Sequence, residues 1–117
     1  MSANTNSPID FTDRFGKHYQ ISPMDIFYVE ADNIYSRIIC QEQNIHISYP
    51  LSLMEEILPD YFLRIHRSFL INRYYITAFH RRTVIMANGF RLPVPEKKHQ
   101  WLKHCLEESD SHSSDNR

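Results

Sequence analysis

Short β-prone runs separated by turn-forming residues dominate this sequence, and they limit the folds that it can adopt. Asn88-Gly89, a pair typical of tight β-turns, separates two of these runs, and Glu30–Asn33 separates two others. A loose alternation from Phe11 to Ile21, with Gly16 near its centre, predicts a short hairpin. The remaining runs predict strands at Ile26–Val29, Ile34–Cys40, Asn44–Tyr49, Phe62–Ile65, Tyr75–Phe79, Thr83–Ala87 and Phe90–Leu92.

Two segments have helical rather than strand periodicity. Apolar residues recur at helical spacing from Leu51 to Leu58, and Pro59 ends this helix because proline lacks a backbone N–H. Glu96–Leu106 predicts an amphipathic closing helix, whose apolar residues near one face are Trp101, Leu102, Cys105 and Leu106. Many short strands with two helices predict an α+β, mostly β fold, with short antiparallel strands in small sheets and no alternating βαβ pattern.

The ends of the chain are polar and lack periodicity. We predict disordered tails at residues 1–10 and 108–117, the second mildly acidic, around one domain at 11–107. No signal peptide and no apolar run of membrane-spanning length is present, so we expect a cytoplasmic protein. Cys40 and Cys105 form no Cys-x-x-Cys pair and are expected to be reduced, packed thiols.

The segment from Arg64 to Asn72 combines apolar anchors with polar side chains of different shape. Arg64 and Arg67 can each hold a phosphate or a guanine edge through two N–H groups. Asn72 can read adenine, and His66 and Ser68 can contact phosphate. Two purely structural alternatives stay open. His66 can be a packed histidine bonded to the backbone, and Asn72 can be the cap of a turn.

A local cationic block surrounds that segment. Between Tyr61 and Pro95 the sequence has six Arg and two His but no Asp or Glu, although the net charge of the chain is −1. The arginines are Arg64, Arg67, Arg73, Arg81, Arg82 and Arg91. Such a block is typical of a protein that binds a polyanion, while solvated strand and turn residues are the alternative.

Four segments of the sequence occur in a characteristic order. The chain reads DIFYVEADNIY at 25–35, LSLMEEILP at 51–59, FLRIHRSFLIN at 62–72, and then Asn88-Gly89 followed by Leu92-Pro93-Val94. In this order and spacing they resemble the LytTR-type DNA-binding domain, over roughly Phe15 to Leu106, with RIHRSFLIN as the most specific part. The resemblance implies an output domain of bacterial response regulators. It also implies loops that read successive major grooves, and a homodimer on two direct-repeat half-sites.

Carried over by position, the resemblance implies three DNA-contacting places. The first comprises Asn33, Tyr35, Ser36 and Arg37, the second comprises His66, Arg67 and Ser68, and the third comprises Glu96, Lys97 and Lys98. The third place departs from the family, which often has Ser followed by Arg after Leu-Pro-Val. Lys97 and Lys98 can still touch the DNA backbone as point charges. A helix cap and a bond from a cytosine amino group are both open roles for Glu96.

These observations predict sequence-specific binding of double-stranded DNA in transcription regulation. The alternative is a protein-interaction module that presents the Arg-rich face to an acidic partner. We expect no enzyme activity, no cofactor, no metal, no membrane partner and no small-molecule substrate. His99 and His104, for example, are five apart on the last helix and do not share a face. We expect a monomer in solution. Family members commonly follow a receiver or a membrane segment, so a stand-alone regulator and an excised output domain are both open.

Overall fold

A computed structural model describes residues 7–115, which form three antiparallel sheets and two α-helices. The strands are β1 (Ile9–Thr12), β2 (His18–Ile21), β3 (Ile26–Asp32), β4 (Tyr35–Cys40), β5 (Asn44–Ile47), β6 (Phe62–His66), β7 (Phe69–Asn72), β8 (Ile76–His80), β9 (Thr83–Met86) and β10 (Arg91–Pro93). The helices are α1 (Leu51–Ile57) and α2 (Glu96–Asp115), and single 3-10 turns η1 (Pro23–Asp25) and η2 (Arg73–Tyr75) precede β3 and β8. The predicted α+β, mostly β class is confirmed.

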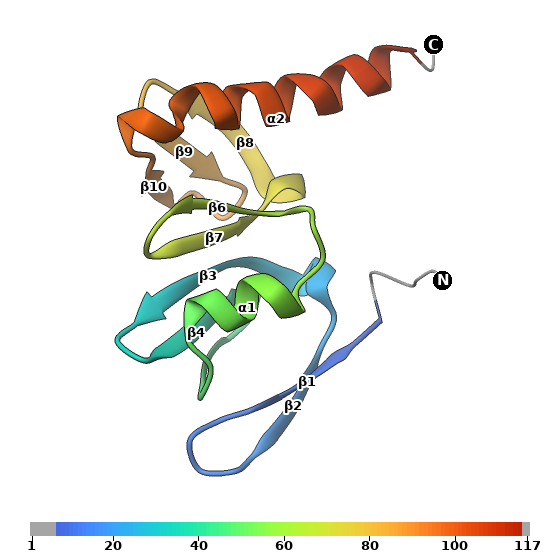
Figure 1. The fold of residues 1–117 in the computed structure, drawn as a ribbon. Helices are drawn as coiled ribbons and strands as arrows, with labels where there is room; N and C mark the ends of the chain where they lie inside the picture. The colour runs from blue at the N-terminus through green and yellow to red at the C-terminus, as the bar shows by residue number, and fades with distance from the viewer. Residues whose placement is uncertain (1–6, 116–117) are drawn as a thin grey trace.

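A five-stranded sheet with the order β5-β4-β3-β7-β6 forms the middle layer of the molecule. Strand β3 lies at its centre, and its two faces are covered by the two hydrophobic cores. Ile26, Phe27, Tyr28 and Val29 are accordingly all buried, which explains why this strand shows an apolar run rather than alternation. Figure 1 shows the β1-β2 hairpin and α1 on one side of this sheet, and the β10-β9-β8 sheet with α2 on the other.

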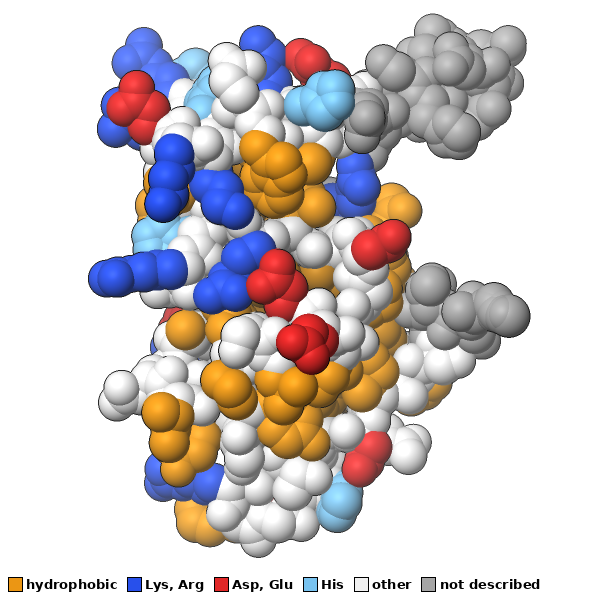
Figure 2. All heavy atoms as spheres, viewed as in Figure 1, with side chains coloured by type: hydrophobic (Ala, Val, Ile, Leu, Met, Phe, Trp, Pro, Cys, Tyr) orange, Lys and Arg blue, Asp and Glu red, His pale blue; other side chains and the backbone are white. Residues whose placement is uncertain are grey.

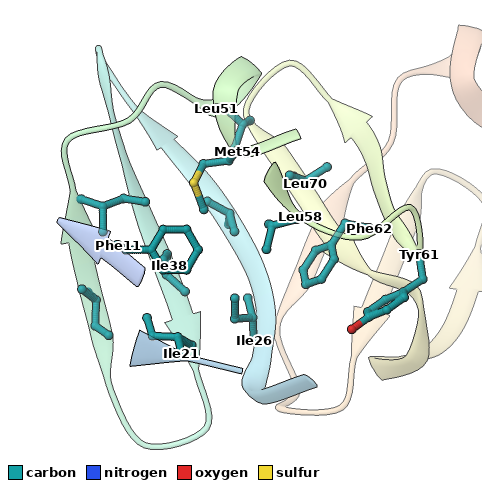
Figure 3. Close-up of a cluster of buried hydrophobic side chains, with 13 residues drawn as sticks. Phe11, Ile21, Ile26, Ile38, Leu51, Met54, Leu58, Tyr61, Phe62 and Leu70 are labelled. Atoms are coloured by element: carbon teal, nitrogen blue, oxygen red, sulfur yellow. The ribbon is translucent and has the colours of Figure 1, made fainter. Parts of the chain in front are cut away.

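Two hydrophobic cores lie on opposite faces of the middle sheet. In the first core, Phe11 of the hairpin and Met54 of α1 pack with Ile38 of the sheet, as Figure 3 shows. In the second, Leu102 of α2 packs with residues from the sheet and from β9 and β10. Neighbouring residues of one strand alternate between the cores: Leu70 belongs to the first and Ile71 to the second. The period-2 geometry of a strand produces this alternation.

The turn between β3 and β4 is shorter than the sequence predicts. Residues Glu30–Asn33 were expected to form it, but β3 continues to Asp32 and the turn residues are Asn33 and Ile34. Glu30 lies directly opposite Arg37 in the register and forms an ion pair with it. The polar residues after Val29 therefore belong to a strand whose end is held by cross-strand charge.

The ends of the described chain also differ from the prediction. Helix α2 continues to Asp115 rather than ending at Leu106, so residues 108–115 of the expected acidic tail are helical. The sequence in that stretch has no Gly or Pro to end a helix. Strand β1 begins at Ile9, inside the expected N-terminal tail. The rest of the two predicted tails, residues 1–6 and 116–117, lies outside the described residues. No helix in the described part of the chain is long and apolar enough to cross a membrane.

Candidate nucleic-acid interface

The three predicted places lie along one edge of the molecule, at the left in Figure 1. The Ala31 N–H donates to the Ser68 carbonyl oxygen at 2.8 Å, which joins the end of β3 to the β6–β7 turn. A groove of about 370 Å³ joins that turn to the start of α2, and its lining comprises Arg64, His66, Arg67, Pro95, Lys97 and Lys98. We call Asn33, His66, Arg67, Lys97 and Lys98 the contact edge. Figure 2 shows Lys and Arg side chains gathered along the upper part of this edge.

Arg64 holds the β6–β7 turn rather than facing solvent. Its Nε donates to the His66 carbonyl oxygen at 3.0 Å, and its Nη2 donates to the Arg67 carbonyl oxygen at 2.8 Å. Its Nη1 donates to Glu55 Oε1 of α1 at 2.8 Å, and the side chain is only 23% exposed. The planar guanidinium suits this task because its N–H groups point in fixed directions. A DNA contact by Arg64 itself has no support in this geometry.

The two ring nitrogens of His66 differ in their bonding: Nδ1 is hydrogen-bonded inside the turn, and Nε2 is not used by that bond. Its Nδ1 accepts the backbone N–H of Ser68 at 3.0 Å, and its ring lies 5.5 Å from the ring of Phe69. A nitrogen that accepts carries no proton, so the neutral ring has its proton on Nε2. The alternative role of His66 as a histidine bonded to the backbone is therefore confirmed. A DNA contact by its Nε2–H donor stays a prediction. Ser68 is half-buried beside it.

The tips of the two hairpins at the contact edge are exposed. Arg67 is exposed at the β6–β7 turn, and its backbone is fixed by Arg64. Asn33 is exposed at the β3–β4 turn with a φ of 61°, a left-handed conformation that Asn adopts more readily than most residues. Tyr35 is half-buried and lines a separate cavity of about 470 Å³ shared with the β1–β2 hairpin.

Two predicted contact residues, Ser36 and Asn72, are fully buried, so the prediction that their side chains contact DNA is wrong. Ser36 Oγ donates to the carbonyl oxygen of Tyr49 at 2.7 Å. Asn72 Oδ1 accepts the backbone N–H of Tyr74 at 2.9 Å, and its Nδ2 donates to the carbonyl oxygen of Ile26 at 3.1 Å. The alternative role of Asn72 as the cap of a turn, here η2, is confirmed. Buried polar groups need such partners, and these bonds hold both side chains inside the protein.

Arg37 is partly committed to the protein. It donates to Glu30 Oε2 across the strand pair, and this hydrogen bond with the carboxylate raises the pKa of the guanidinium. The side chain is 38% exposed, so a phosphate contact from its outer surface is sterically open. The nearby carboxylate weakens the attraction of that position for an anion.

The start of α2 presents its two lysines differently. Lys97 is exposed at the groove, whereas the Nζ of Lys98 lies 4.6 Å from the ring centroid of Trp101, which is 39% exposed. Glu96 Oε1 accepts from Arg82 Nη2 at 3.2 Å, a partner that the sequence did not indicate. Both members of this pair are well exposed, so it neutralises charge without adding much stability.

The predicted cationic block therefore divides into two groups. Arg64, Arg73 and Arg82 are bound to protein groups; Arg73 Nη2, for example, donates to the carbonyl oxygen of Cys105 at 2.7 Å. Arg67, Arg81 and Arg91 are exposed. Glu55, which fixes Arg64 from α1, is a functional residue that was not predicted. No sequence signal shows this pairing, because it depends on how a helix and a strand meet in space.

Comparisons with known proteins agree with this architecture. The sequence profile of the LytTr DNA-binding domain family matches residues 16–107. The structure is similar to that of the LytTr DNA-binding domain of a Bacillus cereus protein described as a methyl-accepting/DNA response regulator. That similarity has a TM-score of 0.71 and 27% sequence identity, and it covers 86% of this chain and 96% of the other. No curated protein gives a significant sequence match. The family profile spans most of the chain and the folds agree, so this chain belongs to the LytTr DNA-binding domain family.

Proposed function

We propose that this domain binds double-stranded DNA with sequence specificity and acts in transcription regulation in the bacterial cytoplasm, without catalysis. The observation that carries the proposal is the β6–β7 turn, in which a largely buried arginine, Arg64, fixes the backbone that presents an exposed arginine, Arg67. A turn fixed in this way loses little backbone entropy on binding. Membership of a DNA-binding family supports nucleic acid as the partner.

The contact edge offers each kind of contact that specific binding needs. Arg67 can donate two N–H groups to the O6 and N7 atoms of guanine, and His66 Nε2–H can donate to a base or a phosphate. Lys97 and Lys98 supply positive charge for phosphates, which releases counterions and makes the affinity depend on salt. Turns that project from two hairpins, rather than a helix laid along a groove, would carry the base contacts.

We further propose that two copies bind two direct-repeat half-sites. The domain measures 45 × 33 × 24 Å, and one turn of B-DNA is about 34 Å long. One copy can therefore cover about one turn, and a second copy is needed to read the next turn from the same face. Copies placed side by side in the same orientation require half-sites that repeat directly.

The rival function is a protein-interaction module with an acidic partner. Its support is that three ion pairs, Glu30–Arg37, Glu55–Arg64 and Glu96–Arg82, reduce the cationic character of this side of the molecule. Charge alone does not separate the two functions, because both partners are anionic. A preference among DNA sequences does.

The experiment is selection of bound duplexes from a random pool by the purified 117-residue chain at near-physiological salt. We expect enrichment of one motif that occurs twice, about one helical turn apart. Enrichment of a motif that occurs only once in each duplex would support specific binding but contradict the direct-repeat arrangement. Recovery without enrichment, with binding that weakens smoothly as salt rises, would leave only a generic cationic surface and favour the protein partner.

A further inference from the structure

Ile34 is an exposed aliphatic side chain at a hairpin tip. It lies between β3 and β4 and is 69% exposed. Neither hydrophobic core includes it, either among the buried residues or among the partly buried ones packed against them. Single exposed aliphatic residues are common on protein surfaces, so exposure alone means little. Ile34, however, lies at the β3–β4 turn beside Asn33 of the contact edge.

The exposed aromatic residues of the described chain each have a side chain against the ring. Phe15 has the guanidinium of Arg14 over its ring, the ring of Tyr74 lies tilted 5.0 Å from that of Tyr61, and the ring of Phe90 lies 6.0 Å from that of Tyr28. Each of these rings therefore contacts another side chain of the protein. The two exposed aliphatic residues are Ile34 and Leu53, and Leu53 is only 38% exposed on α1.

The turn that carries Ile34 is fixed relative to the rest of the contact edge. Asn33, the preceding residue, is in the left-handed region with a φ of 61°, and Asp32 pairs with Tyr35 to close a two-residue turn. The Ala31 N–H donates to the Ser68 carbonyl oxygen at 2.8 Å, which holds this hairpin against the β6–β7 turn. Ile34 and Arg67 are therefore at the tips of adjacent, mutually bonded turns.

We propose that Ile34 is a specificity-determining residue that packs against the 5-methyl group of a thymine in the major groove. Thymine is the one DNA base with a methyl group on its major-groove edge, and an aliphatic side chain is the natural complement of that methyl. The neighbouring polar tip residues can satisfy hydrogen-bonding groups on either side. This inference rests on the proposed DNA-reading function and adds one base preference to it.

The test removes the methyl group from each side of the contact in turn. Starting from the selected duplex, each thymine is replaced singly by deoxyuridine, which lacks the 5-methyl group but keeps every hydrogen-bonding group. Binding is measured by fluorescence anisotropy for the wild type and for Ile34→Ala. At one thymine we expect the wild type to lose about fourfold in affinity, the loss expected for one buried methyl-sized group. Ile34→Ala should bind the thymine and deoxyuridine duplexes equally.

Two matched variants sharpen the result. Ile34→Val keeps a branched methyl surface and should retain part of the preference for thymine over deoxyuridine. Leu53→Ala removes an exposed aliphatic side chain elsewhere and should keep the full wild-type preference. Circular dichroism and thermal melting are the check that each variant is folded, and we expect an exposed turn position to tolerate the change.

The failure of this inference is distinguishable from failure of the proposed function. If the selection enriches a site but no thymine shows a difference that Ile34→Ala abolishes, DNA reading stands and the Ile34 contact is overturned. If Ile34→Ala weakens the thymine and deoxyuridine duplexes equally, the residue supports the turn or a sugar, and the methyl contact is again overturned. If no sequence is enriched, the proposed function itself fails.

Discussion

The Nη2 of Arg64 donates to the carbonyl oxygen of Arg67 at 2.8 Å, so one arginine fixes the backbone of another. The first is 23% exposed and the second is exposed. Their roles differ although their side chains are identical: Arg64 stabilises the turn, and Arg67 is what the turn presents. The following predictions separate these roles.

Arg64→Lys should weaken DNA binding although the charge is kept. Lysine is a point donor and does not reproduce three directed bonds to His66, Arg67 and Glu55. We expect the free energy of unfolding to fall by about 1–2 kcal/mol, measured by urea denaturation. The affinity for DNA should fall by about tenfold because the turn is less preorganised, with the salt dependence unchanged. Arg91→Lys, at an exposed position, is the control and should change neither quantity. A reduced salt dependence in Arg64→Lys would assign Arg64 to a phosphate instead.

Arg67→Ala should relax the preference for one base pair. Loss of a bidentate contact with guanine removes about 1–3 kcal/mol of discrimination at that position. Arg81→Asn is the matched control: it also removes one exposed charge, and Asn suits the φ of 59° at that residue. Repeated selection with each variant is the measurement. An unchanged motif for Arg67→Ala, with uniformly weaker binding, would reassign Arg67 to the DNA backbone.

His66→Asn and His66→Gln should separate the two ring nitrogens. Asn places an oxygen near the position of Nδ1 and can keep the bond from the Ser68 N–H, whereas Gln places a donor near the position of Nε2. We expect His66→Gln to lose about 1 kcal/mol of stability but to keep more DNA affinity. His66→Asn should show the reverse pattern. Thermal melting measures the stability of each variant, and fluorescence anisotropy measures its affinity for DNA. Equal effects of both variants would contradict a donor role for Nε2.

Lys97→Ala should reduce the salt dependence of DNA binding. Each phosphate contact adds about 0.9 to the slope of log K against log salt, so removing one contact lowers the slope by about that amount. Lys103→Ala removes the same charge from another face of α2, six residues further along, and should leave the slope unchanged. The slope is measured from DNA-binding isotherms at several salt concentrations. Equal slopes for both variants would remove Lys97 from the interface.

Cys40 should react slowly with alkylating agents. Burial, helped by the charge of Asp25, raises the pKa of its thiol to about 11. Because the thiolate is the reactive form, the alkylation rate at pH 8 should be about two orders of magnitude below that of a free cysteine with a pKa of about 8.5. The rate should rise with pH until the thiol titrates. Iodoacetamide labelling of a Cys105→Ser variant, followed by mass spectrometry, isolates this thiol; fast labelling at pH 8 would show that Cys40 is not buried.

The local patterns of the sequence predicted most strands and helices, because alternation and turn residues act over a few positions. They failed where the outcome depends on distant partners. Glu30 was assigned to a turn by its polarity, but its place in β3 depends on Arg37 of the neighbouring strand. The last apolar residue, Leu106, predicts the end of α2, but no Gly or Pro follows it and the helix continues to Asp115.

The candidate site was predicted at the level of segments but not of single side chains. Family resemblance placed Ser36 among the DNA-contacting positions, and the capacity of an Asn side chain to read adenine placed Asn72 there. Their burial depends on contacts with Tyr49 and Ile26, which are distant in sequence. Conversely, no role for Ile34 is predicted from the sequence, because an isoleucine in a β-prone stretch is expected to be buried.

The alternation of Leu70 and Ile71 between the two hydrophobic cores has a consequence for how the molecule comes apart. Strand β7, like β3, supplies side chains to both cores at once. Melting one core would remove this shared wall and expose the apolar residues of the other. We therefore expect the two halves of the fold to unfold as one cooperative unit. A substitution that destabilises the core on one side of the middle sheet should also destabilise the core on the other side.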